Sequence, residues 1–439
     1  MNKKILTRRK MIKIGLLGVG GLMLGGPLNL FAKNIARKSS KIKAKAKSVI
    51  QIWMWGGSCH IDTFDPKPQA GHDYCGDLDN AIETNVKRIK INAALPLLAH
   101  QADKYSLIRS MTHGINAHET ASYIMQTGHE PGRLVYPSAG AIVSLFKGYA
   151  AGYKGVVPPY VVLTKGQGRF SESGFLGSKY KPFVTGGDPS KNLFEVEGII
   201  AKGVSDERQL SRRGLLHNLD TLSSKNTEDF QFKKIDKCEK KAYDLMFGDA
   251  KKIFDLSNEN TTVRERYGKN KFGQSCLVAR RLVEADVPYI TINYNGWDTH
   301  KQHFQIMKQK LPEFDQGLSA LLQDLSDKNL LDSTIIWCCG EFGRTPKVMW
   351  DPPWNGGRGH FGQCFSALVA GGGFKGGRVV GKSNETGTEV IERPVHPEDL
   401  IGSIYELMGI DPEGKLPNSK GLNVKLLPGK GNGRLKEIM

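Results

Sequence analysis

Short apolar runs alternate with helical patterns along the chain from residue 48 onward. Six runs rich in β-branched and aromatic residues are typical of buried strands, at residues 48–55, 105–108, 159–163, 289–294, 334–338 and 365–369. Helical patterns lie between several of them and near the end of the chain, at residues 120–126, 139–146, 273–285, 304–325 and 398–408. Helices placed between buried strands predict an α/β fold with a mostly parallel sheet and helices on both faces.

The strand and helix pattern weakens in the middle of the chain. Residues 167–262 are polar, rich in Lys and Glu, and only partly helical in pattern. We interpret this stretch as an inserted cap region within one α/β domain that spans residues 48–430.

Polar residues that carry chemistry follow four of the predicted strands. In chain order they are His60 and Asp62, then His113, His118 and Thr120, then Asp298 and His300, and finally Glu341, Arg344 and His360. Functional residues of parallel sheets gather in the loops at the carboxyl ends of the strands. We therefore expect these side chains to lie along one edge of the sheet.

Histidines and carboxylates that converge on one edge favour a cation site. A single loop histidine is more often a capping or hydrogen-bonding residue. Several together destabilise one another unless a cation binds them or they exchange protons. A shell of His, Asp and Glu suits Zn or Mn, with Ca and Mg as alternatives, and no Cys spacing suggests a structural zinc knot.

The amino-terminal segment carries much of the positive charge. The chain has 62 Lys and Arg against 44 Asp and Glu, a net charge of +18, and residues 1–47 hold thirteen of the basic residues and no acid. Arg8 and Arg9 precede a glycine-rich apolar run that ends near Ala32. This pattern predicts a Tat-like export signal over residues 1–32 and a basic linker over residues 33–47, or else an uncleaved membrane anchor.

Removal of the amino-terminal segment after export would leave a much smaller net charge. Without residues 1–47, 49 basic residues stand against 44 acids, a net charge of +5. The mature domain is only mildly basic, so the sequence gives little reason to expect a nucleic-acid partner. No later segment approaches the length of a membrane span. We expect a periplasmic or cell-surface protein whose partners include the Tat export machinery.

Several sequence blocks together resemble the DUF1501 family. They are residues 56–68, Trp297-Asp298-Thr299-His300, residues 341–346 with His360, and residues 393–400 followed by 409–412. The family consists of exported bacterial proteins, often with a Tat signal, related to sulfatases and to the alkaline phosphatase superfamily. The resemblance covers residues 49–412. It implies an alkaline-phosphatase/sulfatase-like fold with one or two divalent cations at the carboxyl edge of the sheet.

The resemblance implies metal-binding roles for particular positions. Asp62 fits the acid that follows the first strand, and Asp298 with His300 is similar to the middle metal-binding pair, at a closer spacing than in phosphatases. The late Asp-His pair of the superfamily is replaced by Glu341, with His360 further on. With His60, these residues form the predicted metal shell.

The nucleophile position departs from the sulfatase pattern. Sulfatases begin the helix after the second strand with a Cys or Ser that becomes formylglycine, in a Cys-x-Pro-Ser-Arg pattern that ends in Thr-Gly. Here Thr127-Gly128 is present, but ten residues before Gly128 stands His118, without Pro-Ser-Arg. The sequence therefore argues against a formylglycine mechanism. His118 is instead a candidate nucleophile, acid/base or ligand.

Three further residues have alternative interpretations. Thr120 offers a hydroxyl near a helix start, where an anionic ester is also stabilised, or is simply a residue of the first helical turn. His113 is a candidate proton donor to a leaving group. Arg344 either clamps a sulfate or phosphate with paired N–H groups or anchors its own loop.

Two functions of different class follow from this sequence. The first is an exported metal-dependent hydrolase of a sulfate or phosphate ester, on a small anionic molecule or a polysaccharide. The second is a non-catalytic sulfatase-like protein that binds an anionic glycan or a surface partner with the same pocket. His118 at the nucleophile position favours the second, and the predicted metal shell favours the first.

Overall fold

The computed structural model describes residues 42–200 and 248–439 apart from 419–422 and 430, with isolated residues between 203 and 215. The predicted export signal, most of the predicted linker and residues 216–247 of the predicted cap lie outside the described residues, so these predictions stand as made. Among the described helices, none is both long enough and apolar enough to cross a membrane.

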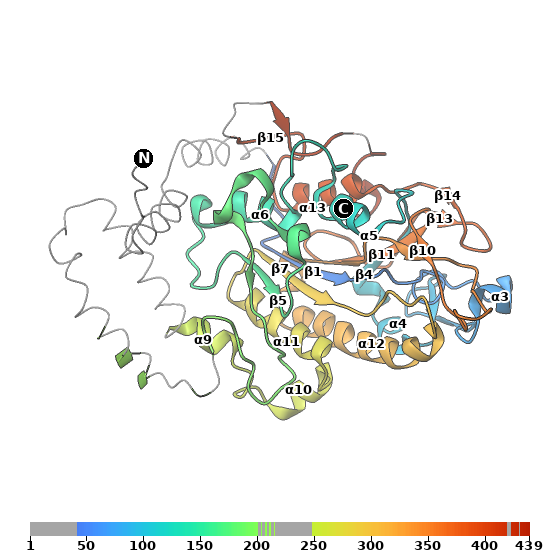
Figure 1. Ribbon diagram of the computed structural model, residues 1–439, viewed down its shortest axis with the longest axis horizontal. Helices are drawn as coiled ribbons and strands as arrows, with labels where there is room; N and C mark the ends of the chain where they lie inside the picture. Colours follow the sequence, from blue (N-terminus) through green and yellow to red (C-terminus); the bar gives the residue numbers. More distant parts are fainter. Residues whose placement is uncertain are drawn as a thin grey trace, which may run out of the picture.

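An eight-stranded sheet forms the centre of the molecule (Figure 1). Its strands in spatial order are β12 (Arg378–Val380), β4 (Tyr105–Met111), β11 (Phe365–Ala370), β8 (Thr334–Cys339), β1 (Ser48–Met54), β7 (Tyr289–Tyr294), β5 (Tyr160–Leu163) and β6 (Phe183–Val184). β11 runs antiparallel to β4 and β8, and the other pairings are parallel. The predicted mostly parallel sheet is confirmed.

The sheet separates two hydrophobic cores. Successive side chains of β1 point to opposite faces, so that Ile50 and Ile52 enter one core and Val49 and Trp53 the other. All seven residues of β1 are buried. A strand buried on both faces reads as a continuous apolar run rather than an alternating one, which explains the pattern in the sequence.

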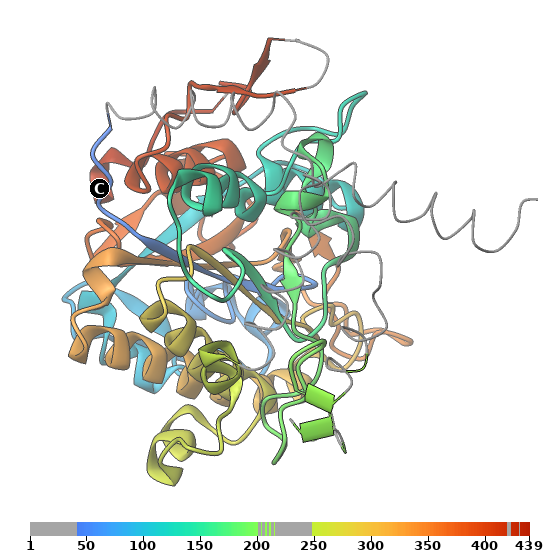
Figure 2. The same cartoon turned by 90° about the vertical axis from the view of Figure 1, so that its left-hand side faces the viewer.

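Helices cover both faces of the sheet. The first core is covered by α4 (Pro96–Ala99), α9 (Asp249–Phe254), α10 (Thr261–Tyr267), α11 (Lys271–Glu284) and α12 (His303–Asp327). The second core is covered by α5 (His118–Thr127), α6 (Ala139–Lys147) and α13 (Pro397–Leu407). Figure 1 and the perpendicular view in Figure 2 show these two layers on either side of the strands. The predicted α/β layer arrangement is therefore confirmed.

The described part of residues 167–262 is joined to the main domain. β6 extends the sheet next to β5, with Val161 opposite Phe183. Phe254 of α9 is fully buried in the first core. A cap formed by the whole stretch remains a prediction, because residues 216–247 lie outside the described part.

Candidate metal centre

The candidate site lies where four parallel strands end. The loops after β1, β7 and β8 meet there, and α5, which follows β4, begins there with His118. A short hairpin of β9 (Gly343–Arg344) and β10 (His360–Phe361) brings His360 to the same place, with His360 paired to Arg344. The predicted gathering of polar residues at one edge of the sheet is therefore seen for several of them.

Two glycines after β1 allow these loops to approach one another. Gly56 has φ +105°, and a Cβ there would lie 2.2 Å from the backbone nitrogen of Asp298. Gly57 has φ +79°, and a Cβ there would lie 2.2 Å from the carbonyl oxygen of Phe342. Only glycine fits at both positions, because the backbone conformation and the space each exclude a side chain. Gly56 and Gly57 therefore both end β1 and allow the loops that carry Asp298 and Phe342 to pack against it.

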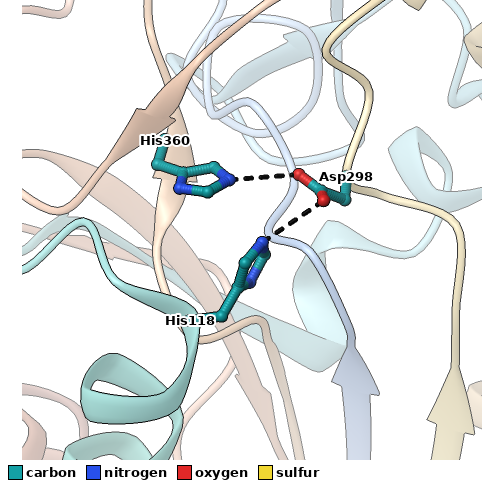
Figure 3. A group of neighbouring side chains, drawn as sticks. All are labelled: His118, Asp298 and His360. Carbon is teal, nitrogen blue, oxygen red and sulfur yellow. Dashed lines mark hydrogen bonds and ion pairs between the residues drawn. The ribbon is translucent and has the colours of Figure 1, made fainter.

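His118, Asp298 and His360 form a compact group of possible metal ligands (Figure 3). One ligand atom from each lies within 4.8 Å of the other two. His118 Nε2 is 3.3 Å from Asp298 Oδ2, and His360 Nε2 is 3.2 Å from Asp298 Oδ1. We call these three residues the metal group.

His300 lies beside the metal group. Its Nε2 is 3.0 Å from Asp298 Oδ1 and 2.9 Å from His360 Nε2. About one third of the His300 side chain is exposed. The imidazole nitrogens of His300 and His360 therefore face the same carboxylate oxygen of Asp298.

Hydrogen bonds orient both histidines of the metal group. His118 Nδ1–H donates to Glu341 Oε1 at 2.6 Å, and His360 Nδ1–H donates to the carbonyl oxygen of Asn116 at 2.8 Å. In each ring the other nitrogen, Nε2, then faces Asp298. A metal-ligating histidine commonly donates its second N–H to a carboxylate or carbonyl in this way, which fixes its tautomer.

Glu341 thus contacts the ring nitrogen of His118 that points away from Asp298, and it lies outside the metal group. Its carboxylate is fully buried and accepts the backbone N–H of Gly56 at 3.0 and 3.1 Å. In the structure the Glu341 carboxylate is bonded to His118, one of the three possible ligands, and the ligand role predicted for Glu341 from the sequence stays a prediction.

Charged neighbours control the protonation of the metal group. Burial alone would raise the pKa of Asp298, but hydrogen bonding from His118 and the charge of Arg344 outweigh it, so the pKa lies well below its usual range. Hydrogen bonds to Asp298 and Glu341 raise the pKa of His118 to about 9 without a metal. Burial lowers the pKa of His300 and of His360, which favours their neutral forms.

Arg344 has the geometry of an anchor. Its side chain is fully buried, and its Nε–H donates to the carbonyl oxygen of Gly56 at 2.8 Å. A second guanidinium nitrogen bonds the same carbonyl and Asp298 Oδ1. Of the two interpretations from the sequence, these contacts support the one in which Arg344 holds the loops together.

The donors present fit a divalent cation. Two imidazole nitrogens and a carboxylate, with a third imidazole adjacent, form the N/O donor set that zinc binds, and they also suit manganese. This donor set does not resemble the all-oxygen shell that calcium prefers.

Asp62 lies in a separate, fully buried network. Both of its carboxylate oxygens contact the Arg358 guanidinium, at 2.8 and 2.9 Å, and His303 Nε2–H donates to Oδ2 at 2.8 Å. Burial opposes ionisation, but Arg358 and His303 lower the pKa of Asp62 overall. We call Asp62, His303 and Arg358 the buried triad.

The remaining predicted site residues also lie outside the metal group. His60 is buried, with its Nε2 2.8 Å from the carbonyl oxygen of Gly387. His113 accepts the N–H of Ile115 through Nδ1 and donates from Nε2 to the carbonyl oxygen of Glu341 at 2.7 Å. Thr120 lines a cavity of about 1020 Å³ between α5 and the start of α13, which His113 also lines. The catalytic roles predicted for His113 and Thr120 remain predictions.

Three residues that build this region were not predicted from the sequence, namely Asn116, His303 and Arg358. Asn116 contributes a backbone carbonyl, for which no side-chain signal exists. His303 follows His300 by three residues, and this proximity was the one signal that pointed to it. Arg358 stands two residues before His360, and this proximity was the one signal that pointed to it.

We expect Glu341→Gln to weaken metal binding by about 10- to 100-fold, because the charged partner that orients His118 is lost while the side-chain shape is kept. Titration of the metal-free wild type and variant with Zn²⁺, monitored by calorimetry, measures the change in metal affinity. An affinity equal to that of the wild type would show that Glu341 has no orienting role. Unfolding curves of both proteins serve as the control for folding.

Comparison with known proteins assigns the chain to a family. The sequence profile described as "Protein of unknown function (DUF1501)" matches residues 46–439. The chain belongs to the DUF1501 family. The resemblance seen in the sequence blocks is thereby confirmed, and the matched region of this DUF1501 protein includes the whole metal group and the buried triad. No curated protein shows significant sequence similarity to it.

Solved structures show distant similarity to this DUF1501 protein. A protein of the alkaline phosphatase superfamily from Vibrio parahaemolyticus is 12% identical, with 87% of this chain and 75% of the other covered and a TM-score of 0.39. The PsFucS1 sulfatase from Pseudoalteromonas sp. is 13% identical, with 90% and 74% covered and a TM-score of 0.36. The lipoteichoic acid synthase LtaP from Listeria monocytogenes is 8% identical, with 90% and 80% covered and a TM-score of 0.37. These similarities concern the fold alone and assign no role to any residue of this protein.

Proposed function

We propose that this protein is an exported metal-dependent hydrolase of a sulfate or phosphate ester. The observation that carries the proposal is the metal group, in which His118, Asp298 and His360 converge within 4.8 Å at the carboxyl edge of the sheet. The ester class follows from the resemblance of the sequence blocks to relatives of the sulfatases. Export to the periplasm or cell surface follows from the Tat-like pattern of residues 1–32.

A cation bound by the metal group would supply a Lewis acid that polarises an ester oxygen. The chain's own residues provide the rest of the chemistry. Glu341 and Asn116 hold the two ligand histidines in position, and Arg344 fixes Asp298. His300, partly exposed beside Asp298, is the residue that we assign to accept a proton from the attacking water and deliver one to the departing oxygen.

One observation favours the non-catalytic alternative. The metal group contains no hydroxyl or thiol nucleophile, and Thr120, the hydroxyl predicted from the sequence, lines a cavity whose lining includes none of the three residues of the metal group. In a hydrolase without such a nucleophile, a water molecule attacks the ester directly. A binding protein would use the same cation only to hold an anionic glycan.

Hydrolysis assays separate these two functions. We expect the metal-loaded protein to hydrolyse 4-nitrophenyl sulfate or 4-nitrophenyl phosphate, and a chelator to abolish the activity. The matched variant His300→Gln should keep the metal and lose most of the turnover, since only the proton-transfer group is changed. Metal-loaded wild type without turnover on either ester would contradict the hydrolase proposal and favour the binding protein.

A further inference from the structure

Two exposed tryptophans lie in the loop between β9 and β10, close to the metal group. We call residues 345–357 the tryptophan loop. Trp350 and Trp354 are each 37% exposed, an unusual exposure for the largest apolar side chain. Exposed apolar side chains gathered in one place commonly mark a binding surface.

The tryptophan loop is held against the segment that carries His300. Gln302 N–H donates to the carbonyl oxygen of Trp354 at 3.3 Å, and His303 N–H donates to that of Gly356 at 3.2 Å. The rings of Trp354 and His300 have their centroids 6.2 Å apart, tilted by 48°. Trp354 therefore neighbours His300, which itself contacts Asp298 of the metal group.

The two tryptophans differ in their packing. Trp350 stacks with His72 at 4.6 Å and with Phe304 at 5.7 Å between ring centroids, which fixes its orientation. Trp354, in the part of the chain that the structure describes, has only the tilted ring of His300 as an aromatic neighbour. The ring face of Trp354 is thus available to stack with a ligand. The Trp350 ring is held in a fixed orientation by His72 and Phe304.

The tryptophan loop borders a cavity of about 590 Å³. Its lining includes Asp73, Thr345, Lys347, Trp350, Asp351 and Trp354. Among the described residues, Asp73, Lys347 and Asp351 form no ion pair, although each is exposed. Their charged ends are thus free to bond hydroxyl groups. Two carboxylates against one ammonium make the cavity unsuitable for a sulfate or phosphate.

We propose that this cavity is a subsite for an uncharged sugar ring of a polysaccharide whose charged ester lies at the metal group. The apolar face of a sugar ring presents C–H groups with partial positive charge, which suit the negative face of an indole ring. Its hydroxyl groups suit the carboxylates and the ammonium group around the rim. The inference rests on the proposed function for the position of the ester and extends it to the substrate class.

Affinity electrophoresis tests the subsite without catalysis. The full-length protein is run, with a chelator present, through native gels that contain agarose, dextran, carrageenan, fucoidan or chondroitin sulfate. We expect at least one polysaccharide to retard the wild type, and Trp354→Ala to weaken that binding by about five- to ten-fold. Trp354→Phe should retain most of the affinity, because a ring remains.

Tyr149→Ala, at an exposed aromatic residue between α6 and β5, is the matched control and should bind as the wild type does. No retardation by any of the five polysaccharides, or equal retardation of the wild type and Trp354→Ala, would overturn the subsite. Binding to phospholipid vesicles alone would also overturn it and point to a membrane surface. Because the gels contain a chelator, sugar binding is measured without bound metal. A failure of the hydrolysis assay would therefore not change the outcome of this binding test.

Discussion

Asp298→Ala is expected to lower the affinity for the bound cation by at least about 100-fold and to abolish the metal-dependent hydrolysis. Asp298 is the carboxylate that His118, His300 and His360 all face. Removing it leaves three imidazoles without the negative charge that offsets the cation. Loss of a residue that merely supports a ligand already costs about 10- to 100-fold, so loss of a ligand should cost more.

Metal analysis of the variant after loading and dialysis measures this effect. Asp298→Asn is the matched variant, because it keeps the shape and one carbonyl oxygen for Arg344 but removes the charge. Because Asp298 is also the partner of the buried Arg344, urea unfolding of both variants and the wild type serves as the control for folding. Retention of the cation with wild-type affinity by Asp298→Ala would show that the metal group is assigned wrongly.

Arg358→Met should destabilise the fold by about 3–5 kcal/mol. Arg358 is fully buried and pairs with Asp62, which is 1% exposed, so its removal leaves an uncompensated charge in the interior. Arg358 also donates to the carbonyl oxygens of Thr345 and Tyr74, which join separate loops. Urea unfolding monitored by circular dichroism gives the change in the free energy of unfolding.

A double variant tests the cause of this destabilisation. Asp62→Asn combined with Arg358→Met should be less destabilised than the sum of the two single variants, because the unpaired charge is gone. Lys308→Met, which breaks the exposed pair with Asp77, is the control and should cost less than about 1 kcal/mol. Wild-type stability of Arg358→Met would contradict the role of the buried triad.

Six of the eight strands of the central sheet were predictable from the sequence because strands buried on both faces give unbroken apolar runs, whereas the short strands β6 and β12 were not predicted. Strand β7 (Tyr289–Tyr294) was predicted with its observed bounds. Asp298 was located by its place after a strand, and His118 by the resemblance to the sulfatase pattern, in which the position is counted back from Gly128. Three of the ten predicted site residues form the metal group.

The roles of the carboxylates were harder to predict. Asp62, Asp298 and Glu341 all follow strands, and in the sequence each looks like a ligand. What separates them is the partner: Asp62 is paired with Arg358, 296 residues away along the chain, and Glu341 accepts hydrogen bonds from Gly56, 285 residues away. Local patterns carry no information on contacts across such separations.

Metal content of the purified wild-type protein tests the account most directly. The protein is loaded with Zn²⁺ or Mn²⁺, dialysed to remove loosely held ions, and analysed by mass spectrometry against a variant in which His118, Asp298 and His360 are all alanine. We predict about one tightly held cation per wild-type chain and none in the variant. A wild-type protein that retains no cation, or a variant that retains as much, would contradict the account.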